Sequence, residues 1–459
     1  MEYIEFIKQK EVKIKPEGFD VCVNELNPIL FEWQKTVVKR ALLKGRFLLG
    51  EDAGLGKTFQ QLEWAYQINQ KTGKDILIAA PLGVVIQTAT EEAPKMGYEV
   101  HICRSKKDVK TGINITNYEM VHEFKDYDWG GVVLDESSIL KNFTGATRIL
   151  LKDIFRNTPY KLCASATPAP NEYMELLNQA DFLGVMDTSK ALANFFINDF
   201  KTGSWRLKGH ATDAFWKWVC SWALIIDKPS DIGFDDSRYE LPKLTIYEEL
   251  LEVSEIDNTF ENGLFRDIQT SATGFHKEKR NTAKMRVKRT ADIVNNDTEN
   301  QYLIWCDTNQ EADLLKEAIP SAVEVRGSHN AKFKEDATMR FKSGEIRILI
   351  SKPSIFGYGM NFQMCSKVVF CGLTYSYEDY YQALKRIWRF GQRNEVDVYI
   401  ILGSTEKKIL EVIREKEAKQ IEIKNQMNNS LKELQILEIQ GKEIERIQPY
   451  INVELPMWL

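Results

Sequence analysis

Short apolar segments that alternate with helix-like segments dominate the first part of this 459-residue chain. Four of these segments have the length and composition of strands: RFLLG (46–50), DILIAAP (75–81), VVLD (132–135) and KLCASAT (161–167). Their residues are continuously apolar instead of alternating with polar ones, which is typical of strands that are covered on both faces of a parallel sheet. We therefore expect a parallel α/β lobe over residues 28–171, preceded by an N-terminal segment at 1–27.

The same alternation returns in the last third of the chain. Five more apolar segments predict strands: QYLIWC (301–306), AVEVRG (322–327), IRILIS (346–351), KVVFCG (367–372) and VDVYIIL (396–402). They predict a second lobe at 296–405. Between the lobes we expect a helical, aromatic-rich insert at 172–245 and a basic helical linker at 246–295, and after them a helical tail at 406–459. The predicted fold class is α/β with two parallel-sheet lobes.

The overall composition excludes several classes of protein. The chain is 43% hydrophobic and 28% charged, which is ordinary for a globular protein. Its seven cysteines are scattered and form no CxxC pair, which argues against a disulfide framework or a zinc module. No apolar run reaches the length of a membrane span, so we expect a soluble cytoplasmic protein. The net charge of −5 gives no overall basic field, so binding of nucleic acid would need a local positive groove.

A glycine-rich segment, FLLGEDAGLGKT (47–58), joins a predicted strand to a predicted helix. Glycines let backbone N–H groups curl around phosphate oxygens, and the helix N-terminus adds its positive dipole end. The lysine would reach the outer phosphates, and the threonine hydroxyl would bind Mg²⁺. Glu51 stands where the strict pattern has glycine. The residues expected to bind ATP are Gly54, Leu55, Gly56, Lys57 and Thr58.

Two adjacent acids end the predicted strand VVLD: Asp135 and Glu136. Placing them together costs like-charge repulsion and desolvation, which a bound cation would offset. Acids also begin many ordinary loops, but downstream of a phosphate-binding loop this pair indicates chemistry. We expect Asp135 to hold Mg²⁺, together with Thr58, and Glu136 to position and deprotonate the attacking water.

With these motifs the chain resembles the superfamily-two helicases and translocases. It is most similar to the Swi/Snf-like branch, in particular to compact phage-encoded helicases of the DEAD/DEAH type. The motifs that carry the resemblance, in the family's order, are LFEWQ (30–34), DAGLGKT (52–58), DESS (135–138), SATP (165–168), FGYGMNFQ (356–363) and QALKRIWRFGQ (382–392). The resemblance implies two RecA-like lobes, ATP and Mg²⁺ as cofactors, and ATP hydrolysis that drives movement on nucleic acid.

The resemblance also implies roles for single residues. Gln34 would sense the adenine. Residues implied to couple the state of ATP to movement of the lobes are Ser165, Thr167, Gly359 and Asn361. Catalytic residues are expected to be Lys57, Glu136, Gln382, Arg386 and Arg389. The two arginines are three residues apart, so one helical face can present both to the γ-phosphate. Residues implied to contact nucleic acid are Pro81, Asn117, Tyr118, Ser351 and Gly357.

These expectations lead to one function and several alternatives. We expect a DNA-stimulated ATPase that translocates on duplex or branched DNA. An RNA helicase, an ATPase that serves as a switch or loader, and the motor subunit of a restriction complex are alternatives. DNA is favoured over RNA because the acidic motif reads DESS instead of DEAD. The helical tail either folds back on the second lobe or binds a partner protein.

Two further stretches allow two interpretations each. HKEKRNTAKMRVKR (276–289) is either a stripe that follows phosphates, through Arg280, Lys284 and Lys288, or an ordinary solvated helix. Four tryptophans crowd into the insert, and they either stack on bases or fill a helical core. They are Trp205, Trp216, Trp218 and Trp222.

Overall fold

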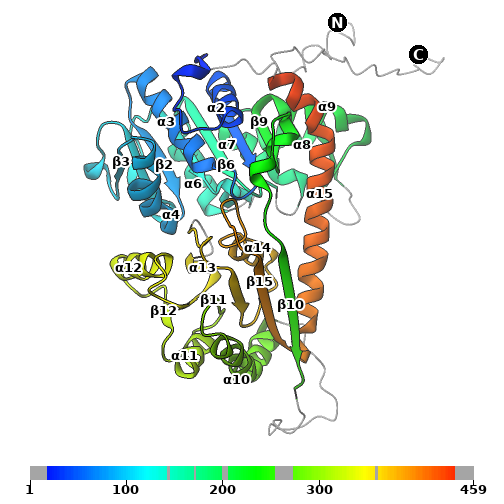
Figure 1. Ribbon diagram of the computed structural model, residues 1–459. Helices are drawn as coiled ribbons and strands as arrows, with labels where there is room; N and C mark the ends of the chain where they lie inside the picture. The colour runs from blue at the N-terminus through cyan, green and yellow to red at the C-terminus, as the bar shows by residue number, and fades with distance from the viewer. Residues whose placement is uncertain are drawn as a thin grey trace, which may run out of the picture. The chain divides into compact units, whose positions relative to one another are not determined.

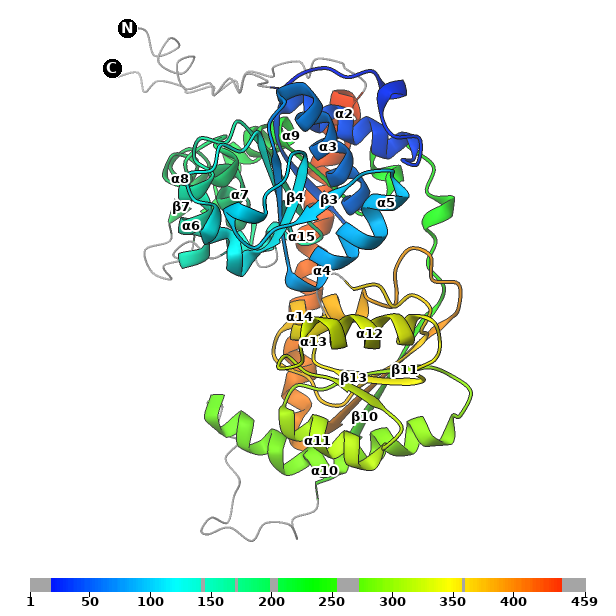
Figure 2. The ribbon, with the colours of Figure 1, turned by 90° about the vertical axis from the view of Figure 1, so that its left-hand side faces the viewer.

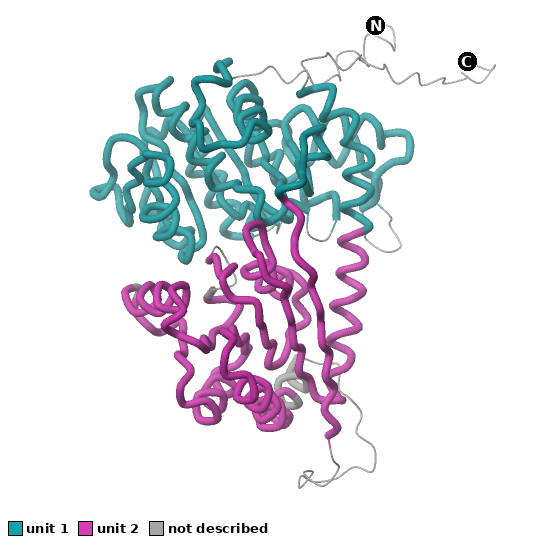
Figure 3. The backbone as a smooth tube through the Cα atoms, viewed as in Figure 1, with its two compact units in different colours: residues 1–238, 422–459 teal, residues 239–421 magenta. Residues whose placement is uncertain are grey.

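The computed structural model describes most of the chain in six ranges (Figure 1): 18–141, 145–169, 172–198, 205–253, 272–356 and 360–439. The chain divides into two compact units (Figure 3). Unit 1 comprises residues 1–238 and 422–459, and unit 2 comprises residues 239–421.

Unit 1 is built on a seven-stranded parallel sheet in the order β3-β4-β2-β5-β6-β1-β9. In chain order its strands are β1 (Arg46–Glu51), β2 (Ile76–Ala80), β3 (Val100–Ile102), β4 (Ile113–Asn117), β5 (Gly131–Asp135), β6 (Tyr160–Ser165) and β9 (Ala223–Ile226). Because β6 lies between β1 and β5, the carboxyl end of β6 lies between the phosphate loop and the acid pair.

Helices cover both faces of this sheet, with α2, α3 and α5 on one side and α6, α7 and α8 on the other (Figure 2). The helices are α2 (Glu32–Lys44), α3 (Lys57–Thr72), α4 (Leu82–Gln87), α5 (Ala93–Lys95), α6 (Ala146–Ile154), α7 (Leu176–Leu183), α8 (Thr188–Phe195) and α9 (Thr212–Trp222). A short antiparallel hairpin consists of β7 (Phe196–Asn198) and β8 (Trp205–Leu207). A π-helical turn, η2 (Thr88–Glu92), joins α4 to α5.

The region predicted as a helical insert, 172–245, belongs partly to the sheet. It contains α7 to α9 as expected, but Ala223–Ile226 forms β9 beside β1. ALII directly follows a tryptophan-rich helix, and a four-residue apolar run has no period that separates strand from helix. The tryptophans fill the core, since Trp216, Trp218 and Trp222 are buried in the main cluster of unit 1.

Unit 2 contains a six-stranded parallel sheet in the order β10-β15-β14-β11-β13-β12. Its strands are β10 (Leu244–Leu251), β11 (Tyr302–Trp305), β12 (Val323–Val325), β13 (Ile348–Ser351), β14 (Lys367–Phe370) and β15 (Val396–Gly403). The strand β10 corrects the prediction of a helical linker from residue 246, because its residues pair with β15 along their whole length. Its exposed residues alternate too weakly to indicate a strand from sequence.

The helices of unit 2 bury both faces of the sheet. They are α10 (Ala272–Asn296), α11 (Asn309–Ala318), α12 (Ala331–Lys342), α13 (Pro353–Phe356) and α14 (Tyr377–Leu384). One core cluster joins the sheet to α12, α14 and the start of α15 (Lys407–Ile439), and the other joins it to α10 and α11. The predicted fold class, α/β with two parallel-sheet lobes and a C-terminal helix, is therefore confirmed.

Short 3₁₀ turns connect these elements. They are η1 (Val23–Glu25), η3 (Lys106–Asp108), η4 (Tyr118–Phe124), η5 (Ser137–Lys141), η6 (Tyr173–Glu175), η7 (Gly209–Ala211), η8 (Pro229–Ile232), η9 (Ser237–Tyr239) and η11 (Ser404–Glu406). All seven cysteines are free. Within the described ranges, no helix is both long and apolar enough to cross a membrane.

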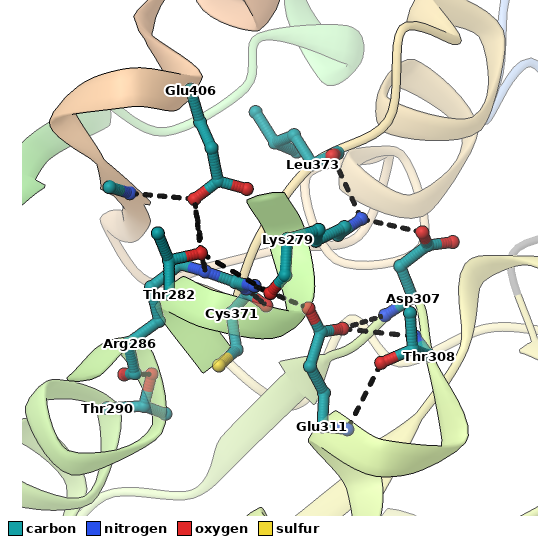
Figure 4. Close-up of polar contacts among 11 residues, drawn as sticks. Lys279, Thr282, Arg286, Thr290, Asp307, Thr308, Glu311, Cys371, Leu373 and Glu406 are labelled. Carbon is teal, nitrogen blue, oxygen red and sulfur yellow. Dashed lines mark hydrogen bonds and ion pairs between the residues drawn. The ribbon is translucent and has the colours of Figure 1, made fainter. Parts of the chain in front are cut away.

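Helix α10 has two cations on its buried face and basic residues on its exposed face. Figure 4 shows the buried side, where Arg286 donates to the Glu311 carboxylate at 2.7 Å and to the Cys371 carbonyl at 2.6 Å. The Arg286 Nε also lies 3.2 Å from Glu406 Oε2. All three charged side chains are inaccessible to solvent, so the network is compensated internally and ties α10 to the ends of β14 and β15.

A second cation of the same face, Lys279, donates to Asp307 at 2.6 Å and to the Leu373 carbonyl at 3.0 Å. The basic residues that the sequence singled out as a stripe are exposed on the other side of the helix: Arg280, Lys284 and Lys288. Their exposure is compatible with both interpretations of this stretch, and their role stays a prediction.

We expect Arg286→Met to destabilise unit 2 by about 3–5 kcal/mol, because it leaves the Glu311 and Glu406 carboxylates buried without their cation. Hydrogen exchange of the β14 amides measures the loss in this unit alone. Lys288→Met, on the exposed face of the same helix, is the matched control and should change exchange little. Equal protection in both variants would show that the network contributes no stability.

Candidate functional site

The phosphate loop leaves β1 and enters α3 through a tight backbone turn. Gly56 has φ +80° and is the N-cap of α3, a conformation that residues with a side chain rarely adopt. A Cβ on Gly56 would lie 2.5 Å from the Gln34 amide nitrogen. The local sequence therefore needs glycine here for two reasons, backbone conformation and the close approach of α2.

Lys57 is the cation at the centre of unit 1's site. Its ammonium donates to the backbone carbonyls of Glu51, at 2.7 Å, and Asp52, at 3.0 Å. Burial lowers the pKa of Lys57, and neighbouring carboxylates oppose that shift: those of Glu51, Glu136, Asp52 and Asp135. The site thus gathers four acids around one lysine at the carboxyl ends of β1 and β5.

Glu51, which stands where the strict phosphate-loop pattern has glycine, is fully buried. One carboxylate oxygen accepts a hydrogen bond from Gln60 Nε2 at 2.7 Å. Burial raises the pKa of Glu51 to about 7, although Lys57 and the bond from Gln60 act in the opposite direction. Glu51, the last residue of β1, therefore has a charge that depends on pH near neutrality.

Asp135, the expected metal ligand, ends β5 and is held in place from two sides. Its Oδ1 accepts from Gln61 Nε2 at 2.7 Å, and its backbone carbonyl accepts from the Tyr118 hydroxyl at 2.6 Å. Burial raises the pKa of Asp135 to about 6, with the bond from Gln61 opposing the shift. Tyr118, expected at the nucleic-acid surface, thus has its hydroxyl directed to the acid pair.

Glu136 adopts a left-handed conformation, with φ +56°, which is uncommon for a residue other than glycine. Its Oε1 accepts two hydroxyl hydrogen bonds, from Ser138 and from Ser165, each at 2.9 Å. The Ser165 oxygen in turn accepts from the Thr167 backbone N–H at 3.0 Å. Glu136 and the SATP segment are therefore joined by hydrogen bonds.

Gln34, expected to sense adenine, is buried against the phosphate loop. Its Nε2 donates to the Leu55 carbonyl at 2.8 Å, and its Oε1 accepts from the Phe31 N–H at 2.9 Å. The structure thus joins Gln34 to the loop that contains Gly54 and Leu55. Contact with adenine stays a prediction.

The arginine motif of unit 2 differs from its predicted geometry. Helix α14 ends at Leu384, so Arg386 and Arg389 lie in the turns after the helix and do not share a regular helical face. Arg386 is buried and donates to the Gln382 side chain at 2.9 Å and to the Met360 carbonyl at 3.3 Å. Arg386 therefore fastens the motif within unit 2, and Arg389 is partly buried beside it.

The remaining predicted residues of unit 2 are only partly described. Gly357 and Gly359 lie outside the described residues. Asn361 accepts from the Gln363 N–H at 3.1 Å and shapes a local turn. Ser351 is buried, and its hydroxyl donates to the Val325 carbonyl at 3.0 Å, so the side chain is used inside the unit.

Ser351 lines a cavity of about 360 Å³ at the carboxyl ends of β12 and β13. The polar residues around it include Arg326, Ser328, Lys352 and Ser354. In unit 1, Pro81 is the N-cap of α4, and Asn117 ends β4 and donates to Glu119.

Sequence reasoning missed the two glutamines that hold the acids, Gln60 and Gln61. They follow Lys57 by three and four residues, a spacing that turns a helical side chain back toward the start of the helix and the adjoining strand ends. That spacing is the signal from which they could have been found. Among the described residues, no group of three or more His, Cys, Asp or Glu side chains could hold a metal ion.

Two family models match the chain, one in each unit. The SNF2-related domain covers residues 37–203, and the helicase conserved C-terminal domain covers residues 285–391. Together with the loop and the acid pair, they define a superfamily-two ATPase. The match over residues 37–203 supports the Swi/Snf-like branch of this superfamily, and the chain is an ATP-hydrolysing enzyme. The resemblance to phage-encoded members rests on sequence motifs alone.

Several relatives share low identity over much of this chain. The TATA-binding protein-associated factor mot1 of Schizosaccharomyces pombe is 23% identical over 98% of this chain and 29% of its own length. The DNA repair and recombination protein RAD26 of Saccharomyces cerevisiae is 21% identical over 70% of this chain and 34% of its length. The DNA annealing helicase and endonuclease ZRANB3 of Homo sapiens is 21% identical over 84% of this chain and 39% of its length.

The chain therefore spans about a third of the length of these relatives. Among solved structures, the Sulfolobus solfataricus SWI2/SNF2 ATPase core in complex with dsDNA is 18% identical, with a TM-score of 0.41. That alignment covers 93% of this chain and 97% of the other.

We expect Glu51→Gln to raise the free energy of unfolding by up to about 3 kcal/mol at pH 8. The folded pKa of Glu51, about 7, lies above its ordinary value of 4.5, so the folded protein binds this proton more tightly than the unfolded chain does. Stability therefore falls as pH rises from about 4.5 to about 7, and the substitution removes this loss. Urea unfolding at pH 5 and pH 8 measures the difference.

The gain in the free energy of unfolding of Glu51→Gln should be several-fold smaller at pH 5 than at pH 8. Glu99→Gln, whose side chain is exposed, serves as the control and should show no such dependence. A gain that is equal at both pH values would mean that Glu51 does not titrate in this range.

Proposed function

We propose that this ATPase is a motor that translocates on duplex or branched DNA and couples each step to ATP hydrolysis. The observation that carries the proposal is the hydrogen bond of Ser165 to Glu136, with Thr167 bound to the same Ser165. A displacement of the SATP segment would move the carboxylate expected to activate water. That is the linkage a motor needs between hydrolysis and movement.

Unit 1 would bind ATP through the phosphate loop and position the water. Lys57 would exchange its bonds to the Glu51 and Asp52 carbonyls for the outer phosphates. Both hydroxyl bonds to Glu136 go to Oε1, so we assign Oε2 to the attacking water. The left-handed backbone of Glu136 sets the direction of this carboxylate.

Mg²⁺ would be held by Thr58 and Asp135. Hydroxyl and carboxylate oxygens are the ligands that this ion prefers, and the cation would offset the repulsion between the crowded acids. When bound, the ion neutralises charge that develops on the phosphates. Gln61 orients the Asp135 carboxylate by donating to its Oδ1, and we assign Oδ2 to the ion.

Unit 2 would complete catalysis with arginine. Arg386 is committed to Gln382 and Met360, so its role is to hold the motif in shape. We assign the main contact with the γ-phosphate to Arg389, which is more exposed than Arg386. Guanidinium stays charged and forks onto phosphate oxygens, which suits the spread of charge in the transition state.

The cavity beside Ser351 is our candidate contact for the nucleic-acid backbone in unit 2. Arg326 is paired with Glu324 and Asp313, so Lys352 is the cation that we assign to phosphate. Few base edges would be contacted by such a surface, which predicts weak sequence preference. DNA is favoured because RAD26 and ZRANB3 are named for their action on DNA and because the acidic motif reads DESS.

We expect Arg389→Ala to lower kcat for ATP about 100-fold or more while changing ATP affinity less than about three-fold. Lys57→Ala should instead abolish turnover together with tight ATP binding, because it removes the cation of the phosphate loop. Steady-state turnover and nucleotide titration separate the two outcomes. Turnover that survives Arg389→Ala unchanged would exclude a catalytic contribution from this arginine.

The nucleic acid that stimulates ATP turnover most strongly identifies the substrate of the motor. ATP turnover of the full chain is measured with single-stranded DNA, duplex DNA, forked DNA and RNA, each at matched nucleotide concentration and low salt. We expect duplex or forked DNA to stimulate turnover most, by at least about ten-fold. Preference for RNA would favour an RNA helicase, and equal low rates with all four would favour an ATPase that serves as a switch or loader.

A further inference from the structure

The end of helix α15 is an integral part of unit 1 (Figure 3). Met427 and Leu431 are buried in the main core cluster of that unit. The side chain of Gln435 accepts from the Ile225 N–H at 2.7 Å and donates to the Ile225 carbonyl at 3.1 Å. Because Ile225 belongs to the edge strand β9, the glutamine amide occupies the position that another strand would take.

Charged contacts fasten the same part of the helix to strand ends of unit 1. Lys424 is bonded to the Asp227 carboxylate, and its ammonium lies 3.5 Å from Asp52 Oδ1. Asn428 Nδ2 donates to the other oxygen of Asp227 at 2.7 Å. Asp227 follows β9 directly, and Asp52 is the first residue of the phosphate loop after β1. One lysine from the C-terminal helix thus neutralises acids at two adjacent strand ends.

A short chain of contacts links this lysine to the phosphate-binding lysine. The Asp52 N–H donates to the Ile226 carbonyl at 3.0 Å, which extends the pairing of β1 with β9 by one residue. The Asp52 carbonyl accepts from Lys57 Nζ at 3.0 Å. Asp52 therefore contacts Lys424 through its side chain and Lys57 through its backbone.

We propose that Lys424 is a positioning residue for nucleotide, which compensates the Asp52 and Asp227 carboxylates so that phosphates can enter the loop. Without this cation, the negative charge of both acids would be less compensated beside a loop that must accept a polyanion. Repulsion would weaken binding, and the released Asp52 side chain would loosen the entry of the loop. This inference rests on the proposed binding of ATP by the loop, and it assigns the tail a part in that site.

The test measures nucleotide affinity in the full chain without nucleic acid. A fluorescent, non-hydrolysable ATP analogue is titrated into the parent and into Lys424→Met, and the KM and kcat for ATP are measured with duplex DNA. We expect the Kd of the analogue and the KM to rise about ten-fold, with kcat at saturating ATP within about two-fold of the parent. Lys432→Met, an exposed lysine on the same part of α15, is the matched control and should leave both constants unchanged.

Two further variants separate charge compensation from simple anchoring of the helix. Lys424→Arg should bind the analogue as the parent does, because it keeps the charge. Adding Asp52→Asn to Lys424→Met should recover most of the lost affinity, because it removes the negative charge that Lys424 faces at the entry of the loop. Lys424→Gln replaces the methionine variant if circular dichroism shows that Lys424→Met is unfolded.

Parent-like affinity in a folded Lys424→Met or Lys424→Gln protein would overturn the inference, and so would failure of Asp52→Asn to recover binding. Failure of the proposed function has a different signature. The parent would then bind the analogue, and the variants would behave as expected, but no nucleic acid would stimulate turnover.

Discussion

The balance of charge around Lys57 is the constraint on which the rest of unit 1 depends. Its ammonium is held by two backbone carbonyls and surrounded by four acids at the carboxyl ends of β1 and β5. Burying that many carboxylates near one lysine is costly unless each has a partner. Gln60, Gln61 and Ser165 supply partners for Glu51, Asp135 and Glu136 from α3 and β6, and Lys424 lies near Asp52. The strand order of the sheet therefore brings together the groups that the site needs.

The sequence predicted what is encoded locally. Nine strands were predicted close to their observed positions because each is a short apolar run bounded by polar or glycine residues. Six described strands were missed: β3, β4, β7, β8, β9 and β10. Of these, β9 was missed because ALII continues a helical aromatic stretch, and β10 because none of its residues is buried. The segments β9 and β10 form strands because they pair with β1 and β15, which are distant in sequence.

In the candidate site, too, features encoded by local motifs were predicted and features that depend on distant partners were not. Glu136 and Ser165 were predicted from motifs, and the structure joins them through one carboxylate oxygen. The contact of Lys424 with Asp52 could not be predicted, because 372 residues separate partners that only the folded chain brings together. The geometry of Arg386 was predicted wrongly, because a spacing of three residues indicates a helical face only where the helix continues.

Gln435 has a consequence for the lifetime of the protein in a crowded cell. The edge of a parallel sheet offers unpaired N–H and C=O groups to any extended peptide, and Ile225 would present such groups if Gln435 did not cover them. Proteolytic trimming of the tail back past this glutamine would therefore expose the β9 edge of the sheet as a template for aggregation. Selection to keep the last turns of α15 can thus arise from solubility as well as from activity.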